Sequence, residues 1–478
     1  MNCNLKRKLS SDTYKLAYDF SAECKHLNSI VARREPIQVD HEYEISQLIV
    51  GLHEAYEKKF IELFQMRFAP KDSLNRFLYE QLSLKNCPES LIKAPENILQ
   101  MNTIDKEIRT SFPITSNFKD DSPKWKLINN LKDCIHISDK FSLGKECINR
   151  YDNEPLKKLL NNEIIYSEFK SVRNDLFHLL ETDIEEKINQ IKSFLFEELK
   201  SILVKIETIL ATIPLNNIEF KVKIVVNRGD DFVFVHYREQ KLKLLRFHYE
   251  KLKTLFNLNK KKFKNSVNFE ERVYCLLSRY QTFFKYNEVI NEGYGMQASL
   301  PSKVFVELNR TFKVKQEMFA SPFNCYFKQY CSAFPDTDVF FGSQGSFFDF
   351  DPNENSSFQC NPPFTEEVIE RLADRIEYLL ENSKYALSYL VFIPEWIEPP
   401  TPGLVKMEKS KFNRMHFNVD NGAHHYVSGS QHVSNEDPQL YTAMHNTRVF
   451  VLQNEAGYSL FTPTKEKIEK LKVAMTFF

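Results

Sequence analysis

The chain has 478 residues with equal numbers of basic (Lys and Arg) and acidic (Asp and Glu) side chains, 64 each, so its formal net charge is zero. This balance argues against a polycation that coats nucleic acid without specificity, and a hydrophobic fraction of 42% excludes wholesale disorder. No apolar run approaches the roughly 18 residues of a membrane span, and the polar first ten residues lead us to expect no signal peptide. Nine cysteines without a CxxC pair are typical of reduced thiols rather than of disulfides or a zinc site.

The first part of the chain is predicted to be helical. Only three of the 11 glycines occur in the first 290 residues, so turn-forming residues are scarce there. Residues 43–67 have helical periodicity, and apolar residues at steps of three and four mark one face of a long helix from residue 184 to Pro214. We therefore expect a helical domain over residues 1–215.

A β-hairpin is expected next. Apolar residues alternate with others in 219–226, the turn sequence Asn-Arg-Gly-Asp follows at 227–230, and a second alternating run ends at His236. Two helices should come after it, at about 239–256 and 268–285. Together, residues 216–290 are predicted to join the helical domain to a C-terminal domain.

After residue 290, predicted strands alternate with predicted helices. This order indicates an α/β domain over 291–478 with a mostly parallel sheet, and ligands of such sheets bind beyond the carboxyl ends of the strands. The expected strands are Val314–Phe319, Val339–Phe341, Ser357–Cys360, Ala386–Ile393 and Arg448–Leu452, and the expected helices are Cys325–Phe334, Val368–Leu380 and Lys465–Met475.

The segment Asn361-Pro362-Pro363-Phe364 has the clearest chemistry. It lies between a predicted strand and a predicted helix, at the carboxyl edge of the sheet, and its two prolines stiffen it. The exocyclic amine of a purine is a weak nucleophile, and a site that methylates it needs acceptors for its two N–H groups. The Asn361 oxygen and the Pro362 carbonyl can accept them, while Phe364 stacks on the ring. The alternative is a proline-rich connector without a chemical role.

An earlier strand–loop–helix offers a cofactor site. In a methyltransferase-like sheet the loop after the first strand holds the amino-acid part of S-adenosylmethionine, and an acidic residue farther on holds its ribose. The loop here contains Ser321, Pro322 and Asn324, and the acidic candidates are Asp336 and Asp338, for which a solvated turn is an equal alternative. A GxGxxA match at 293–298 lacks a preceding strand, so we interpret it as unrelated to dinucleotide binding.

The segment Pro394–Pro400 follows a buried strand and places Trp396 between Glu395 and Glu398. An indole beside carboxylates suits a positively charged, methylated purine, and a tryptophan that anchors the core is an equal alternative. The histidines between residues 424 and 432 lack further ligands at zinc spacing, so no metal site is predicted.

Taken together, these residues resemble the phosphorylated-CTD-interacting factors, a family also called cap-specific adenosine methyltransferases. The resemblance is dense from about residue 272 to 470 and thins in the helical half. The segments that carry it are 319–327, 330–338, 361–364, 392–396, 398–402, 428–432 and 452–454, with 74–77 in the helical half.

The resemblance implies a Rossmann-like class I methyltransferase sheet with an N-terminal α-helical domain that clamps capped RNA. The implied reaction is S-adenosylmethionine-dependent N6-methylation of the cap-adjacent 2′-O-methyladenosine of 7-methylguanosine-capped mRNA, without a metal. By similarity Asn361, Pro362, Pro363 and Phe364 bind the methyl donor, and Asn361, Pro362 and Phe364 serve in catalysis. The implied substrate contacts are Arg76, Lys93, Glu366, Trp396, Ile397, Glu398, Pro399 and Pro400.

The chain also departs from the family. Lys93 stands where the family has an arginine, which keeps the charge but loses the planar fork, and Gln344 replaces the arginine of a Gly-Ser-Arg-Gly segment. Trp125 and Trp396 are too far apart for the WW domain of vertebrate members, so we expect that domain to be missing and docking to RNA polymerase II to be in doubt. We expect a nuclear monomer that binds the 5′ end of capped mRNA and no membrane.

Two other functions fit the same residues. The chemistry could act on an internal RNA adenine, a DNA adenine or a protein amide, because the Asn361–Phe364 segment alone does not separate them. Alternatively, the chain is a catalytically weakened RNA-binding relative, for which Lys93 and Gln344 argue.

Overall fold

The structure is a computed structural model. It describes positions 19, 21 and 69 and residues 37–64, 73–84, 165–212, 220–226, 230–263, 267–283, 296–397, 400–433 and 440–476. The chain divides into two compact units, one made of residues 1–50, 78–95 and 203–478 and the other of residues 51–77 and 96–202.

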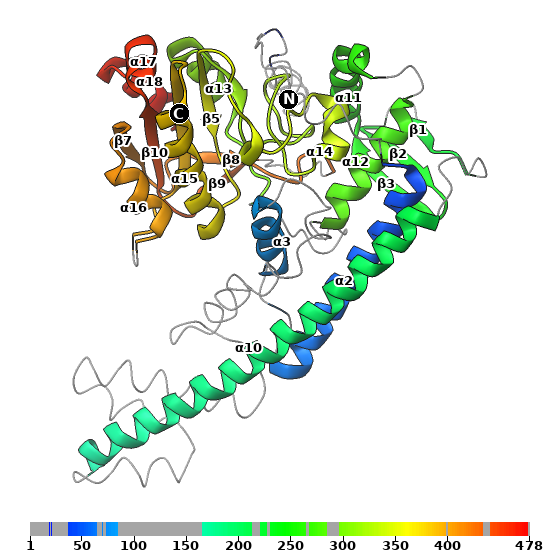
Figure 1. The fold of residues 1–478 in the computed structure, drawn as a ribbon, viewed down its shortest axis with the longest axis vertical. Coiled ribbons are helices and arrows are strands. Elements are labelled where there is room, and N and C mark those ends of the chain that lie inside the picture. The colour runs from blue at the N-terminus through cyan, green and yellow to red at the C-terminus, as the bar shows by residue number, and fades with distance from the viewer. Residues whose placement is uncertain are drawn as a thin grey trace, which may run out of the picture. The chain divides into compact units, whose positions relative to one another are not determined.

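Long helices supply the described part of the second unit. It contains most of α2 (Val39–Phe64), the start of α3 (Ser73–Leu84) and much of α10 (Ile165–Thr212), and α2 runs alongside α10 (Figure 1). The face predicted from the sequence is the buried one, because the apolar side chains at steps of three and four on α10, from Ile188 to Leu199, are all shielded from solvent.

A three-stranded antiparallel meander belongs to the first unit. Strands β1 (Lys223–Val226) and β2 (Phe232–Tyr237) form the predicted hairpin, with Val226 opposite Val233. Strand β3 (Gln240–Leu245) pairs with β2 on its other side. The helix expected from residue 239 therefore begins later, as α11 (Arg246–Asn259), and is followed by the short 3₁₀ helix η2 (Lys260–Lys262) and by α12 (Phe269–Phe283).

The central sheet of this unit has five strands in the order β4-β5-β6-β10-β7. Strands β4 (Val314–Glu317), β5 (Ser356–Cys360) and β6 (Leu387–Pro394) are parallel. Strand β10 (Thr447–Gln453) pairs antiparallel with β6 and with β7 (Asn413–Val419). The expected mostly parallel sheet is therefore a mixed one with two parallel and two antiparallel pairings.

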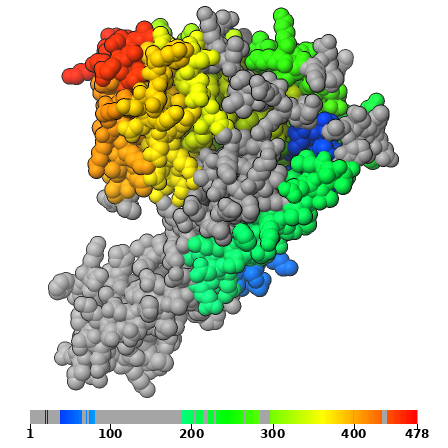
Figure 2. Space-filling model, in the orientation of Figure 1, coloured from blue at the N-terminus to red at the C-terminus, as the bar shows by residue number. Residues whose placement is uncertain are grey.

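Helices cover both faces of this sheet, so β6 is buried along its whole length. Its residues alternate between two cores: Tyr389 and Val391 pack with α15 (Glu366–Asn382) and α16 (Pro402–Lys409), whereas Leu390 and Phe392 pack with α13 (Ser302–Phe312) and α18 (Lys465–Met475). In the space-filling view these yellow to red elements form one continuous body (Figure 2).

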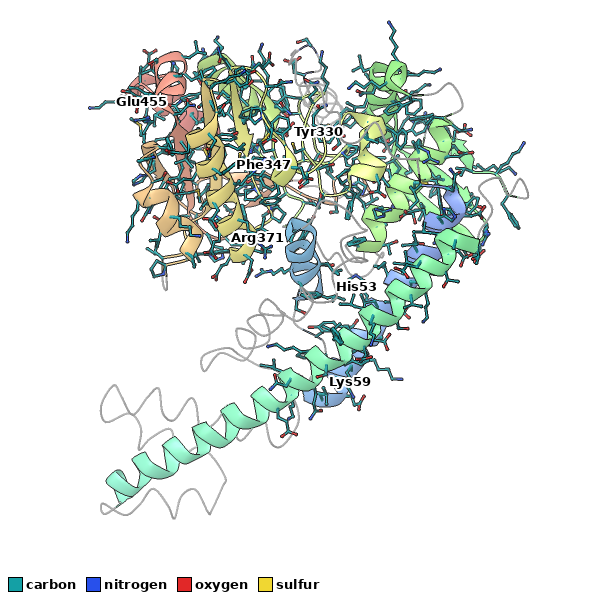
Figure 3. All side chains as sticks on the ribbon, in the orientation of Figure 1. His53, Lys59, Tyr330, Phe347, Arg371 and Glu455 are labelled. Carbon is teal, nitrogen blue, oxygen red and sulfur yellow. The ribbon has the colours of Figure 1, made fainter. Side chains whose placement is uncertain are left out.

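Two expected elements between β4 and β5 are absent from this described stretch. Residues 325–334 form no helix, because their backbone bonds are non-local: the Cys331 N–H donates to the Glu317 carbonyl and the Cys331 carbonyl accepts from Ala320. Tyr330 in this segment is fully buried (Figure 3). The expected strand Val339–Phe341 is the 3₁₀ helix η3.

The remaining short elements are α14 (Pro335–Asp338), η4 (Phe347–Asp349), β8 (His425–Val427), β9 (Leu440–Thr442) and α17 (Glu455–Leu460). None of the helices in the described ranges has the length and apolar character needed to cross a membrane.

Candidate active site

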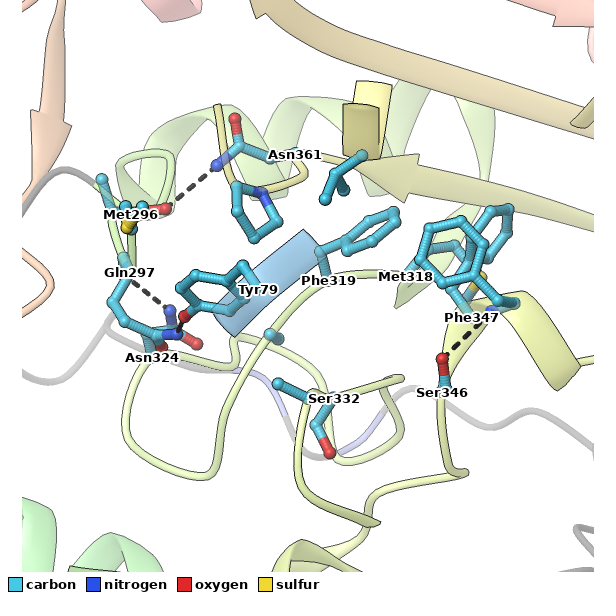
Figure 4. Close-up of a pocket in the computed structure, with 16 residues that line it drawn as sticks. Tyr79, Met296, Gln297, Met318, Phe319, Asn324, Ser332, Ser346, Phe347 and Asn361 are labelled. Atoms are coloured by element: carbon cyan, nitrogen blue, oxygen red, sulfur yellow. Dashed lines mark hydrogen bonds between the residues drawn. The ribbon is translucent and has the colours of Figure 1, made fainter. Parts of the chain in front are cut away.

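A pocket lies across the carboxyl ends of the neighbouring parallel strands β4 and β5 (Figure 4). The space between its walls amounts to about 610 Å³, part of it open to solvent. The carboxyl edge of a parallel sheet is where the sequence predicts a ligand. The lining residues are Tyr79, Met296, Gln297, Ala298, Met318, Phe319, Ala320, Asn324, Ser332, Ala333, Ser346, Phe347, Phe348, Asn361, Pro363 and Val368.

Asn361 is the first residue after β5, and its amide is held in one orientation. Its Nδ2 group donates to the Ala298 carbonyl at 3.0 Å, which directs Oδ1 away from that carbonyl. The side chain is 8% exposed, and its Oδ1 atom has no hydrogen-bond partner among the described residues. A buried amide oxygen without a donor costs free energy, so this atom is a candidate acceptor for a bound ligand.

The other residues of the predicted segment contribute unequally. Pro363 lines the pocket, whereas Pro362 is buried and does not line it. No donor of the described residues reaches the Pro362 carbonyl. The Phe364 ring packs edge-on against Tyr426, with ring centroids 5.9 Å apart, so its stacking on a substrate ring stays a prediction.

The loop after β4 brings Asn324 to the pocket. The Asn324 Oδ1 atom accepts from the Ser321 N–H at 2.6 Å, and its Nδ2 group donates to the Gln297 carbonyl at 2.9 Å. Ser321 and Pro322 are buried and do not line the pocket, so Ser321 acts by orienting Asn324.

Two buried ionisable side chains hold the far side of the same loop. The Glu317 carboxylate, at the end of β4, accepts from the N–H groups of Tyr326 and Phe327 at 2.7 and 3.0 Å. The Lys251 ammonium donates to the carbonyls of Phe323 and Cys325 at 2.8 and 2.7 Å. The loop therefore has its own internal supports, which the sequence interpretation did not include.

The two acidic candidates for a ribose ligand do not line the pocket. Asp338 is fully buried and accepts from the Tyr280 hydroxyl at 2.7 Å and from the side chain of Ser332, which does line the pocket. Burial raises the pKa of the Asp338 carboxyl to about 7. Asp336 pairs with Arg279 at 2.9 Å.

Several lining residues were not anticipated. Tyr79 comes from α3, and its hydroxyl is hydrogen-bonded to the Gln297 side chain. Met296, Gln297 and Ala298 are the end of the GxGxxA match that was interpreted as unrelated to dinucleotide binding; residues 293–295 lie outside the described residues. The glycine-rich match could have indicated that residues 296–298 line the pocket. Nothing in the sequence around Tyr79 indicates that it does.

The predicted substrate contacts are only partly described. Lys93, Glu398 and Pro399 lie outside the described residues. The others lie on different elements. Arg76 is on α3, Glu366 is the first residue of α15, and Trp396, Ile397 and Pro400 follow β6, with Ile397 and Pro400 exposed.

Glu395, next to Trp396, is already neutralised by the protein. Its carboxylate pairs with Arg448 and accepts from Asn446 at 2.9 Å. Burial raises its pKa, but the hydrogen bonds from Arg448 and Asn446 outweigh burial and hold the pKa below the usual range. Glu395 is therefore not a free counter-charge for a methylated base.

The histidines near residue 430 are used in packing. The His424 ring is hydrogen-bonded to the Asp420 carbonyl and to Thr447, at 2.9 and 2.8 Å. His432 stacks on Phe323 with ring centroids 4.0 Å apart, and burial lowers its pKa to about 3. In the described ranges, no three His, Cys, Asp or Glu side chains gather as metal ligands.

The fold and the pocket define a class of protein: a mixed α/β sheet, compatible with a methyltransferase fold, with a ligand site at the carboxyl ends of adjacent parallel strands. Residues 251–429 match the family model described as "Phosphorylated CTD interacting factor 1 WW domain". Over these residues the chain is similar to that family.

Curated relatives agree with this family. A Homo sapiens protein named mRNA (2'-O-methyladenosine-N(6)-)-methyltransferase is 45% identical over 245 residues, which are 51% of this chain and 34% of that protein. A Mus musculus protein of the same name is 43% identical over 261 residues, 55% of this chain and 36% of that protein. The chain thus spans about a third of the length of the curated relatives it matches.

The prediction that this chain lacks the family's WW domain is wrong, because the family model that matches residues 251–429 is described as that domain. The prediction rested only on the spacing of Trp125 and Trp396. The spacing of two tryptophans was therefore too narrow a criterion for deciding whether this family's domain is present.

Proposed function

We propose that this chain is an S-adenosylmethionine-dependent methyltransferase that methylates N6 of the cap-adjacent 2′-O-methyladenosine of 7-methylguanosine-capped mRNA. The names of the human and mouse relatives support this activity. The observation that carries it is Asn361: a buried amide at the carboxyl end of β5, with an unpartnered oxygen, on the wall of the pocket.

The pocket residues fit a methyl donor of this kind. The pocket has aromatic walls from Phe319 and Phe347 and polar groups from Asn324 and Ser332, a combination suited to a nucleoside with a polar tail. When bound there, S-adenosylmethionine supplies a methyl group on a positively charged sulfur. Asn324, Ser332, Asn361 and Pro363 are the residues that would hold it.

The chemistry assigned to Asn361 follows from its fixed orientation. The adenine amine is a weak nucleophile because its lone pair is delocalised into the ring. An N–H bond donated to Asn361 Oδ1, and a second to the Pro362 carbonyl, would favour a pyramidal nitrogen with its lone pair directed at the methyl carbon. Methyl transfer would join the methyl carbon to this nitrogen, leave the electron pair of the S–C bond on sulfur, and release one proton from the nitrogen to water.

Recognition of the capped end is assigned to residues outside the pocket. Trp396, Ile397 and Pro400, with Glu398 and Pro399, would bind the cap beyond β6. Glu366 and the helical-domain residues Arg76 and Lys93 would hold the RNA.

The remaining assignments concern the organisation and setting of the chain. Residues 1–215 act as an RNA clamp, 216–290 join the domains, and 291–478 are catalytic. The family description supports an interaction with a phosphorylated CTD, which fits a nuclear monomer working on polymerase II transcripts.

The test is nucleoside mass spectrometry of RNA incubated with the purified full chain and S-adenosylmethionine. RNA that begins with 7-methylguanosine and 2′-O-methyladenosine should gain one methyl group on the cap-adjacent adenosine, and matched uncapped RNA should not. Asn361→Ala should lower the rate by about 10²–10³-fold, as for loss of a group that orients charge in a transition state.

Asn382→Ala is the matched control, because Asn382 is an exposed asparagine at the end of α15, and it should keep the parental rate. Equal methylation of capped and uncapped RNA would refute the cap specificity, and an unchanged rate in Asn361→Ala would refute the catalytic assignment. Absence of S-adenosylmethionine binding in calorimetry would leave the chain as a non-enzymatic RNA-binding relative.

A further inference from the structure

A second large groove lies at the opposite edge of the sheet from the pocket. It is formed where β4 and β5 begin, and its space is about 1770 Å³. Four lysines line it from separate segments: Lys262 of η2, Lys313 and Lys315 at the start of β4, and Lys328. Because β4 and β5 are parallel, this amino-edge groove faces away from the Asn361 pocket at their carboxyl ends.

The charge of the amino-edge groove is concentrated. Glu354 is the only acidic residue among its lining residues, all of which are described, so four positive charges face one negative charge. Partial burial and the nearby charge of Lys328 lower the pKa of Lys262, which indicates that two of these cations lie close together. Like charges held together favour a polyanionic ligand that relieves their repulsion.

Buried polar groups without partners also line this groove. Gln316 is 1% exposed, and neither its Oε1 nor its Nε2 atom has a hydrogen-bond partner among the described residues. The Ser357 hydroxyl, 3% exposed, is likewise unpartnered there. Such groups cost free energy unless a ligand satisfies them, so they are a second sign of a ligand that is independent of the charge.

We propose that the amino-edge groove binds the phosphodiester backbone of single-stranded RNA. Lysines are point charges that suit sequence-independent contact with phosphates, whereas phosphopeptides are typically recognised by the planar forks of arginine clusters. No arginine is among the lining residues, and the exposed Leu258 and Leu460 side chains offer apolar surface for bases. The choice of RNA over other polyanions rests on the proposed function.

The test measures fluorescence anisotropy of a labelled, uncapped 20-nucleotide RNA on the full chain between 50 and 300 mM NaCl, without S-adenosylmethionine. The variant Lys313→Gln/Lys315→Gln/Lys328→Gln should bind about tenfold more weakly or worse at low salt. The slope of log affinity against log salt should be shallower by about 2, since each phosphate contact on a single strand contributes about 0.7.

The matched control is Lys384→Gln/Lys409→Gln/Lys465→Gln, three exposed lysines outside the groove, which should keep the parental affinity and slope. Gln316→Leu should lower RNA affinity while the melting temperature stays level or rises, because a merely structural glutamine would destabilise the chain when replaced.

The proposal would be overturned if the groove variant kept the parental RNA affinity and salt slope, or if it lost no more RNA affinity than the control variant. It is also overturned if a peptide with two phosphoserines loses binding to the groove variant while RNA does not. Calorimetric binding of S-adenosylmethionine should be the same in the groove variant and the parent. Failure of the parent to bind it would count against the proposed function and not against the groove, because the RNA assay contains none.

Discussion

Lys251 is a charged residue in the interior, and its position is explained by the loop that it supports. It is 3% exposed, and its ammonium donates to two carbonyls of the loop that brings Asn324 to the pocket. Burial lowers its pKa, while the nearby Glu317 carboxylate favours the charged form. A buried charge of this kind is tolerated only when it is fully bonded, so the loop and Lys251 stabilise each other.

Replacing Lys251 with methionine should therefore affect both stability and binding. Lys251→Met leaves the Phe323 and Cys325 carbonyls without a donor, and we expect the free energy of unfolding to fall by about 3 kcal/mol. Affinity for S-adenosylmethionine should fall with it, because Asn324 loses its support. Urea denaturation and calorimetry measure the two effects. The control Lys253→Met alters an exposed lysine of the same helix, and equal stability of the two variants would contradict the prediction.

The position of Asn361 could be predicted from the sequence, whereas the burial of Lys251 could not. Asn361 stands at a strand end beside two prolines, a local pattern that indicates an edge of the sheet, and the structure places it in the pocket. Lys251 lies in a helix whose sequence gives no sign that this lysine, unlike Lys253, points inward. Its burial depends on a loop more than 70 residues later in the chain, as its two hydrogen bonds show.

The N-terminal cap of helix α15 lies next to the pocket. The Thr365 hydroxyl caps its first turn by accepting from the Val368 N–H at 3.3 Å, and Val368 lines the pocket. Thr464 caps α18 in the same way, through the Lys467 N–H at 3.3 Å, away from the pocket. The two caps thus make the same hydrogen bond, but Thr365 is buried and next to the pocket, whereas Thr464 is exposed and away from it.

Removing these caps should separate stability from binding. Thr365→Ala and Thr464→Ala should each lower the free energy of unfolding by about 1 kcal/mol, the usual contribution of a threonine cap. Only Thr365→Ala should also weaken S-adenosylmethionine binding, by a few-fold in calorimetry, and Thr365→Ser should restore it. If Thr464→Ala weakens binding as much, the effect is general destabilisation and the link between α15 and the pocket fails.

Elements with local signals at their ends were predicted well. Helix α18 runs over Lys465–Met475 as expected, and the β1–β2 hairpin follows the alternation and the turn sequence. The helix expected over Cys325–Phe334 was wrong, because the Cys331 N–H, which a helix would use internally, donates to the Glu317 carbonyl instead. Competition by a distant backbone carbonyl leaves no trace in the local periodicity.

At the scale of the whole molecule, strand direction was the least predictable feature. Alternation of strands and helices correctly indicated the parallel β4-β5-β6 part. Strands β7 and β10 add antiparallel pairs, because the described residues between them form no crossover helix that would return the chain to the other edge of the sheet. Whether a strand is parallel or antiparallel to its neighbour therefore depends on the connections between strands and not on the sequences of the strands.

The pH dependence of stability is also a property of the whole chain, and Asp338 should contribute to it with a definite sign. Burial raises the pKa of its carboxyl from an unperturbed 3.8 to about 7, although Tyr280 and Thr337 donate hydrogen bonds to it. Between these two values the folded state binds one more proton than the unfolded state. The contribution of Asp338 is therefore greatest at low pH and is lost as the pH rises toward 7.

Urea denaturation of the parent and of Asp338→Asn between pH 5 and 8 measures this contribution. The asparagine does not titrate, so the variant should gain stability relative to the parent by up to about 1.4 kcal/mol per pH unit, until the difference levels off above about pH 7. Asp351→Asn alters a side chain that is 77% exposed and should run parallel to the parent. Parallel curves for Asp338→Asn and the parent would mean that this carboxyl is ionised in the folded chain throughout the range, and the hydrogen bonds from Tyr280 and Thr337 would then outweigh its burial.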